Sequence, residues 1–131
     1  MSIHMSDSEA FVSTTKDGSR PASINARLSY NSSDPIAVTI TFFTPAPISW
    51  KFARDLLIDL MECDQAGEGD ILFEGYDDDR VMITLRSPDG MAHILVDLPW
   101  ICDFTLQTVT MIPVQSEGVI IETALNAALG G

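Results

Sequence analysis

The chain has 131 residues, 46% of them hydrophobic, and its 19 acidic against 7 basic side chains give a formal net charge of −12. This length suits a single domain with a sizeable core, and the hydrophobic share is well above that of a disordered acidic tail. The charge argues against duplex DNA and anionic membrane surfaces as ligands, because both are bound through an excess of lysine and arginine.

The N-terminal residues show no targeting pattern. Met1–Met5 lack the basic and apolar regions of a signal peptide, and no apolar run approaches the ~18 residues that cross a bilayer. We therefore expect a cytoplasmic protein without direct membrane insertion, with residues 1–7 as a flexible terminus and residues 8–131 as one domain. Cys63 and Cys102 stand far apart, which favours two small buried thiols over a disulfide or a metal site.

The first half of the chain predicts strands. Short strands are expected at Ala10–Thr15 and Ala26–Tyr30, separated by turn-forming residues. The clearest strand is Ile36–Thr44, which Pro45 and Pro47 end because proline cannot donate into a ladder. Alternation places one set of apolar side chains on one face of it, and the set resumes in the next strand, as in a hairpin. The set is Ile36, Val38, Ile40 and Phe42, followed by Ile48, Trp50 and Phe52.

The hydrophobic period then changes to that of a helix ending near Cys63. Its apolar stripe is Ala53, Leu56, Leu57, Leu60 and Met61, and acidic residues occupy the other side. Ile58 falls off this stripe, so it is either a singly exposed residue or a contact with another chain. Residues 65–70 have the composition of a loop.

Residues 71–97 predict a meander of three strands, Ile71–Glu74, Val81–Arg86 and Met91–Asp97. A helix follows, with Asp97 as its possible N-cap and Pro99 in its first turn. Its predicted inner face is Trp100, Ile101, Phe104 and Thr108.

The chain closes with an amphipathic pattern typical of a helix. The apolar residues are Ile121, Ala124, Leu125, Ala128 and Leu129. So short a helix is not stable alone, and we expect it to dock on its own body or on a partner. No internal repeat is visible. The chain therefore predicts one α+β domain of about seven short, mostly antiparallel strands, with helices after the fourth and seventh.

Residues that could carry chemistry are few. His93 lies within a strand pattern, which favours a packed or surface residue over a catalytic one. Asp77, Asp78 and Asp79 lack the spacing of a calcium loop and are interpreted as a solvated turn. Trp50, Phe52 and Trp100 could stack nucleobases, but core packing fits better without positive charge around them. We therefore expect no enzyme, no metal and no cofactor.

Arg54 is unusual because it stands in the first turn of a predicted helix, where the helix dipole disfavours a cation. We expect it to pair with a carboxylate elsewhere, Asp34 and Asp70 being the candidates. An anion-binding role is the alternative.

Several segments together resemble the SsgA-like sporulation and cell-division proteins of actinomycetes. The resemblance rests on a tyrosine before a strand of DPYAV type, on a junction of the form W-x-FARDLL, and on a strand that begins with Gly-Asp. The matching residues are Tyr30, Asp34, Pro35, Trp50, Phe52, Arg54, Asp55, Leu56, Leu57 and Asp70, followed later by Ser87-Pro88-Asp89-Gly90, Phe104, Thr108, Pro113 and Glu117. The resemblance covers residues 8 to 129, nearly the whole chain.

This resemblance implies a function. Members of the family are non-enzymatic, have a Whirly-like fold, assemble as trimers and act in septum-site selection. They bring the division ring protein FtsZ to septal sites and have other SsgA-like proteins as partners. Ile58, Ile121, Leu125 and Leu129 are the candidate contacts with a partner or another copy. The fold analogy leaves one alternative, a single-stranded nucleic-acid-binding protein, which the acidic charge disfavours.

Overall fold

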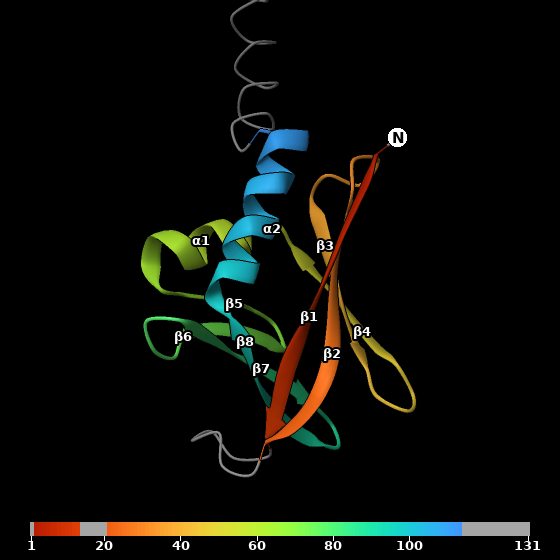
Figure 1. The fold of residues 1–131 in the computed structure, drawn as a ribbon, viewed down its shortest axis with the longest axis vertical. Coiled ribbons are helices and arrows are strands. Elements are labelled where there is room, and N and C mark those ends of the chain that lie inside the picture. Colours follow the sequence, from red (N-terminus) through yellow and green to blue (C-terminus); the bar gives the residue numbers. More distant parts are fainter. Residues whose placement is uncertain (1, 14–20, 114–131) are drawn as a thin grey trace, which may run out of the picture.

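The computed structural model describes residues 2–13 and 21–113, which form two successive units of four antiparallel strands and one helix (Figure 1). The first unit comprises β1 (Ile3–Ser13), β2 (Ala22–Asn31), β3 (Ala37–Phe43), β4 (Ile48–Ala53) and α1 (Asp55–Cys63). The second comprises β5 (Gln65–Glu68), β6 (Ile71–Gly75), β7 (Arg80–Ser87), β8 (Gly90–Asp97) and α2 (Leu98–Met111). The predicted α+β class is confirmed.

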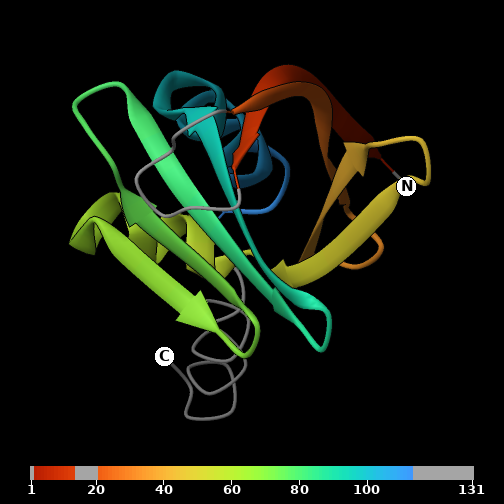
Figure 2. The same cartoon turned by 90° about the horizontal axis from the view of Figure 1, so that it is seen from below.

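All strands belong to one sheet of order β4-β3-β2-β1-β8-β7-β6-β5. The two units join where β1 pairs with β8, over only three residue pairs, Phe11–Ser13 against His93–Leu95. The two strand groups diverge on either side of this join (Figure 2). The N-terminal half of β1 packs instead on α2, where the Trp100 Nε1–H donates to Ser6 Oγ at 3.0 Å.

The predicted β3–β4 hairpin is confirmed, and the predicted apolar set shares one face of it. Ile40 lies opposite Trp50, and Val38 lies opposite Phe52. Alternate β3 side chains are fully buried, and the intervening threonines point away from the core, as a half-buried antiparallel sheet requires. Three members of the predicted apolar set are not buried: Ile36, which precedes β3 in a turn, is 61% exposed, Ile48 is 50% exposed, and Trp50 is partly buried.

Two sequence predictions about the sheet differ from the structure. Residues 3–7, predicted as a flexible terminus, belong to β1, because all of them pair with β2 in the register Ile3–Asn31 to Asp7–Arg27. Residues 65–68, predicted as a loop, form the edge strand β5 opposite β6. Only Ala66 of β5 is buried, so no apolar alternation marks this strand, and the sheet has eight strands rather than about seven.

The helices begin and end close to their predicted limits. In α1, Leu56, Leu57 and Leu60 are buried as expected, but Met61 is 40% exposed and does not belong to the buried stripe. All four residues of the predicted inner face of α2 are buried. Asp97 stands at the N-cap position of α2 without a side-chain capping bond, and Pro99 lies in the first turn.

Asp64 ends α1 and turns the chain into β5. It has a left-handed conformation with φ of 59°, and its N–H donates to the Leu60 carbonyl oxygen at 2.8 Å. Its own carbonyl oxygen accepts the Gly75 N–H at 3.0 Å. A Cβ at Gly75 would lie 2.1 Å from Asp64 Oδ1, so the close approach of these two segments requires glycine there.

Candidate functional site

Arg54 lies at the centre of the motif that the sequence singled out, at the junction between β4 and α1. Its side chain is 1% exposed. Its backbone N–H donates to the Ile36 carbonyl oxygen at 2.7 Å, and its own carbonyl oxygen accepts the Leu57 N–H at 3.0 Å. These backbone bonds fix the direction in which α1 leaves the sheet.

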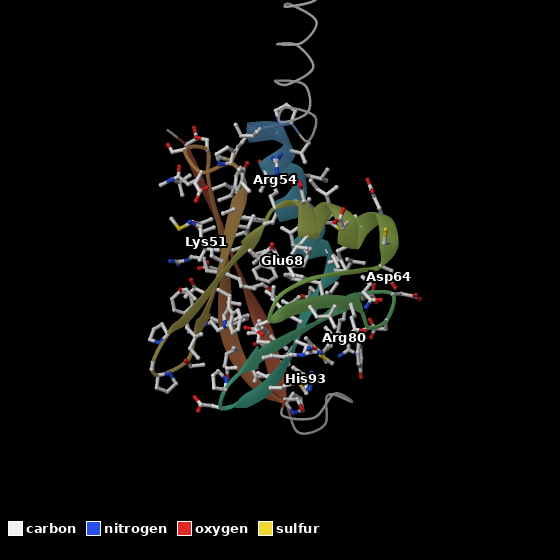
Figure 3. All side chains as sticks on the ribbon, turned by 180° about the vertical axis from the view of Figure 1, so that it is seen from behind. Lys51, Arg54, Asp64, Glu68, Arg80 and His93 are labelled. Carbon is white, nitrogen blue, oxygen red and sulfur yellow. The ribbon has the colours of Figure 1, made fainter. Side chains whose placement is uncertain are left out.

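The Arg54 guanidinium binds the C-terminal end of α2 (Figure 3). Nη1 donates to the carbonyl oxygen of Thr108 at 3.1 Å and to that of Ile112. The carbonyl groups at a helix C-terminus carry its negative partial charge, so a cation there is favourable, even though the Thr108 carbonyl oxygen also accepts the Ile112 N–H at 2.8 Å. Arg54 therefore ties the helix of the second unit to the helix start of the first.

The expected pairing of Arg54 with Asp34 or Asp70 is wrong. The Asp34 carboxylate instead forms an exposed ion pair with Lys51 Nζ at 2.7 Å, and the Asp70 carbonyl oxygen accepts the Arg86 N–H. Arg54 donates to main-chain carbonyls, and its Nε and Nη2 have no hydrogen-bond partner among residues 2–13 and 21–113. Its interior position also gives an external anion no access, so the alternative anion-binding role finds no support.

Two aromatic residues of the motif, Tyr30 and Phe52, make the next contacts. The Arg54 guanidinium lies 5.5 Å from the centre of the Tyr30 ring, a cation–π distance. The Tyr30 hydroxyl donates to the Pro35 carbonyl oxygen at 2.7 Å, which fixes the β2–β3 turn against the same site. Phe52 packs on Phe73 of the second unit with ring centres 5.1 Å apart.

The other predicted site residues divide between core and surface. Leu56 and Leu57 are buried, Asp55 is exposed in the first turn of α1, Trp50 and Ile58 are partly buried, and Asp70 is exposed. Ile121, Leu125 and Leu129 lie outside the described residues. The structure thus brings Tyr30 and Arg54 together with the end of α2, packs Phe52 on Phe73 of β6, and leaves Asp34 and Asp70 outside this group.

The described residues contain no group of three or more histidine, cysteine or acidic side chains that could hold a metal ion. His93 is buried, with Nδ1 3.1 Å from the Thr84 hydroxyl oxygen, as a packed strand residue would be. Cys63 is exposed and Cys102 is partly buried, so the expectation of two buried thiols is wrong for Cys63. Burial and the neighbouring Asp103 raise the pKa of the Cys102 thiol, which disfavours the reactive thiolate.

Asp77 lies in the acidic turn between β6 and β7, where the sequence predicted a solvated tip. Its carboxylate accepts two hydrogen bonds from Arg80 at 2.9 and 2.7 Å and one from the Asp79 N–H at 2.9 Å. These bonds, that of Arg80 above all, lower the pKa of Asp77. Both carboxylate oxygens of Asp77 thus accept hydrogen bonds from within the turn.

Comparison with known proteins places the chain in a family. The family model described as Streptomyces sporulation and cell division protein, SsgA, matches residues 24–117. The chain belongs to the SsgA family. The match includes Tyr30, the whole Arg54 junction and both carbonyl groups that Arg54 binds.

Two relatives of this SsgA-family chain are sporulation-specific cell division proteins named SsgB. The one from Frankia casuarinae is 32% identical over 119 residues, which are 86% of this chain and 81% of the relative. The one from Saccharopolyspora erythraea is 33% identical over 112 residues, which are 81% of this chain and 79% of the relative. The chain is thus a sporulation-specific cell division protein of the SsgA/SsgB family, a family not known as enzymes.

Two solved structures share the fold of the SsgA-family chain. One is described by the finding that mutations in SsgB correlate to longitudinal cell division during sporulation of Streptomyces coelicolor; it matches with a TM-score of 0.79 at 26% identity, covering 89% of this chain and 94% of that one. The SsgA-like sporulation-specific cell division protein of Thermobifida fusca YX-ER1 matches with a TM-score of 0.79 at 25% identity, covering 99% and 96%. In the part of the chain that the structure describes, no helix is long and apolar enough to span a bilayer.

Sequence reasoning missed the two acceptors of Arg54 and the contact between Trp100 and Ser6. A helix C-terminus attracts cations, so the end of the predicted second helix near Thr108 was a usable signal for Arg54. No signal could have found Ser6, because a serine in a polar N-terminal segment resembles any exposed residue.

Proposed function

We propose that this SsgA-family protein is a non-enzymatic, oligomeric adaptor that brings the division ring protein FtsZ to sites of sporulation septation. The observation that carries the proposal is the position of the motif side chains. Tyr30, Phe52, Arg54 and Leu57 lie in the interior and contact the chain's own strands and helices. The motif therefore builds a scaffold, and contacts with partners fall to the outer surface.

That surface offers apolar side chains that a partner could cover. Large hydrophobic residues at least 40% exposed occur on both units, and Ile3 and Met5 stand two residues apart on the outer face of β1. Single exposed hydrophobic residues are ordinary, but neighbouring ones favour a contact surface. The exposed set in the described part of the chain is Ile3, Met5, Ile36, Phe43, Ile48, Met61, Tyr76, Met91 and Leu106.

Charge constrains how such a protein assembles. Each copy adds a net charge of −12, so contacts between copies must come from apolar side chains and strands that outweigh the repulsion. A trimer, with other SsgA-like proteins as further partners, is the assembly we propose on the basis of the family resemblance. Its proposed contact residues are Ile58 on α1 and Ile121, Leu125 and Leu129.

The proposed function is testable in a sporulating actinomycete that carries this gene. FtsZ fused to a fluorescent protein is followed in the wild type, in a strain lacking the gene, and in that strain after the gene is restored. We expect regularly spaced septal rings to be lost in the second strain and to return in the third. Rings that form at normal sites and times without the protein would contradict the recruitment role.

A further inference from the structure

An apolar groove opens at the end of the sheet that the helices do not cover. It has a volume of about 450 Å³ and is lined by side chains of β1–β4 and by the β7–β8 hairpin, with no residue of α1 or α2. The reason is length: β1 has 11 residues, about 36 Å of strand, whereas α1 and α2 have 9 and 14 residues, about 14 and 21 Å of helix. The inner face of the sheet therefore continues past its helical cover.

The lining of this groove is suited to an apolar occupant. Phe42, Leu85 and Ile94 form a buried floor, and Ile48, which is 50% exposed, lines the groove on β4. Asp89 is the one charged side chain among the lining residues that the structure describes. An apolar patch with so little charge at its rim favours a segment that is itself apolar and nearly uncharged.

The sequence contains one segment of that chemistry outside the described residues. Residues 114–131 carry only two charged side chains, Glu117 and Glu122, and place Ile121, Leu125 and Leu129 at helical spacing. The other long segment outside the described ranges, residues 14–20, has no large apolar side chain. The C-terminal segment is thus the one part of the remaining chain that matches the groove.

The position from which this segment starts favours the groove of a second copy. The described chain ends at Pro113, beside the Ile112 carbonyl that Arg54 binds. The groove lies at the other end of the sheet, where Figure 1 shows the tips of the β3–β4 and β7–β8 hairpins. Along β3 the separation from Ile36 to Phe42 is six residues, about 20 Å. A contact between these opposite ends of two copies is head-to-tail and can close into a ring.

We propose that residues 119–129 of one copy dock in the apolar groove of the next copy, with Leu125 entering beside Ile48. This inference rests on the proposed oligomeric function and names its contact. Each chain both donates its C-terminal segment and accepts that of a neighbour, so a ring leaves no groove unfilled.

Light scattering on the full chain tests the contact with matched variants. We expect Leu125→Asp in the segment and Ile48→Asp in the groove each to raise the concentration needed for assembly more than tenfold, because each places a carboxylate in an apolar contact. The controls are Leu106→Asp on α2 and Ile36→Asp at the opposite end of the sheet. Both controls replace side chains that are 61% exposed and outside the groove, and we expect both to assemble like the wild type.

Disulfide trapping decides which chain supplies the segment. In a background of Cys63→Ser and Cys102→Ser, chains carrying Ile48→Cys are mixed with longer, tagged chains carrying Leu125→Cys and then oxidised. We expect a crosslinked heterodimer. A chain that carries both substitutions gives the second test: a crosslink that forms only within that one chain would overturn the exchange between copies. If both aspartate variants assemble like an oligomeric wild type, this inference is overturned and the proposed oligomeric function is unaffected. A monomeric wild type would overturn both.

Discussion

The two units of the fold share one topology but bury their strands differently. In the first unit, β3 buries every second residue and leaves the other face partly open. In the second unit, five consecutive residues of β7, Val81–Leu85, are buried, and so are His93–Val96 of β8. Strands buried on both faces are continuous apolar runs, whereas half-buried strands alternate. The same arrangement thus arises from two sequence patterns, which is why the chain shows no internal repeat.

The charged side chains are also distributed unevenly along the chain. Residues 1–54, which contain the first four strands, have four acidic and five basic side chains, whereas residues 55–131 have fifteen acidic and two basic ones. In the described ranges, Arg27, Lys51 and Arg80 each form an ion pair with an aspartate. The excess acidity therefore belongs to α1 and the second unit, and a basic partner surface would be attracted there rather than to the first four strands.

The largest effect should come from removing the link between the units. Arg54→Ala deletes two hydrogen bonds to α2 and leaves the Thr108 and Ile112 carbonyl oxygens without them. We expect a loss of about 3 kcal/mol in the free energy of unfolding, measured by urea denaturation. Lys51→Ala is the control, because it removes an exposed cation from the same hairpin at a cost below about 1 kcal/mol. Equal effects of both substitutions would contradict a linking role for Arg54.

Two methionines test the difference in burial directly. Met82, on the face of β7 away from the main core, is 3% exposed, and Met5, on the corresponding outer face of β1, is 56% exposed. We expect Met82→Ala to cost about 2–3 kcal/mol of unfolding free energy and Met5→Ala less than about 0.5 kcal/mol. Similar values in the same denaturation experiment would show that the outer faces of the two units do not differ in stability.

A smaller effect is expected where β1 leaves the sheet and packs on α2. Trp100→Phe removes the indole donor to Ser6 but keeps an aromatic ring, so we expect a loss of about 1 kcal/mol. Ser6→Ala should cost a similar amount. The double variant should be less destabilised than the sum of the two single variants, and strict additivity would show that the hydrogen bond does not hold β1 on α2.

The smallest effects concern one exposed ion pair in each unit. Hydrogen bonds from Arg27 and Arg80 lower the pKa values of Asp7 and Asp77 below the ordinary 3.8. A carboxyl group whose pKa is lower in the folded state stabilises the fold above its unfolded pKa and loses this effect as the pH falls through its folded value. Asp7→Asn and Asp77→Asn should therefore lower the melting temperature slightly at pH 7. This difference from the wild type should shrink as the pH falls below 3.8 and vanish below the lowered folded-state pKa values, and a difference that persists there would have another origin.

Local patterns predicted much of this fold because they depend on nearby residues. Alternation located β3 and β4, and helical spacing located the buried face of α2. Local patterns did not identify the partners of Arg54, because they are main-chain carbonyls 54 and 58 residues away; only the general attraction of a helix C-terminus for cations pointed to them. Local patterns did not predict the edge strand β5, because its pairing depends on β6. Its own sequence, Gln-Ala-Gly-Glu, has the composition of a loop.

The sequence predicted residues of the candidate site but not the contacts that they make. The motif identified Tyr30 and Arg54, which the structure places together, whereas the inferred Arg54–carboxylate pair was wrong because a helix end supplies the negative charge. The groove was not predicted, since it exists only where β-hairpins from both units extend beyond the helices.

Co-sedimentation of the purified full chain with FtsZ polymers at physiological salt tests the adaptor role most directly. We predict that the protein pellets with the polymers in a saturable way, remains in the supernatant without them, and does not bind single-stranded oligonucleotides under the same conditions. A protein that stays in the supernatant at every FtsZ concentration would contradict direct recruitment of the division ring protein.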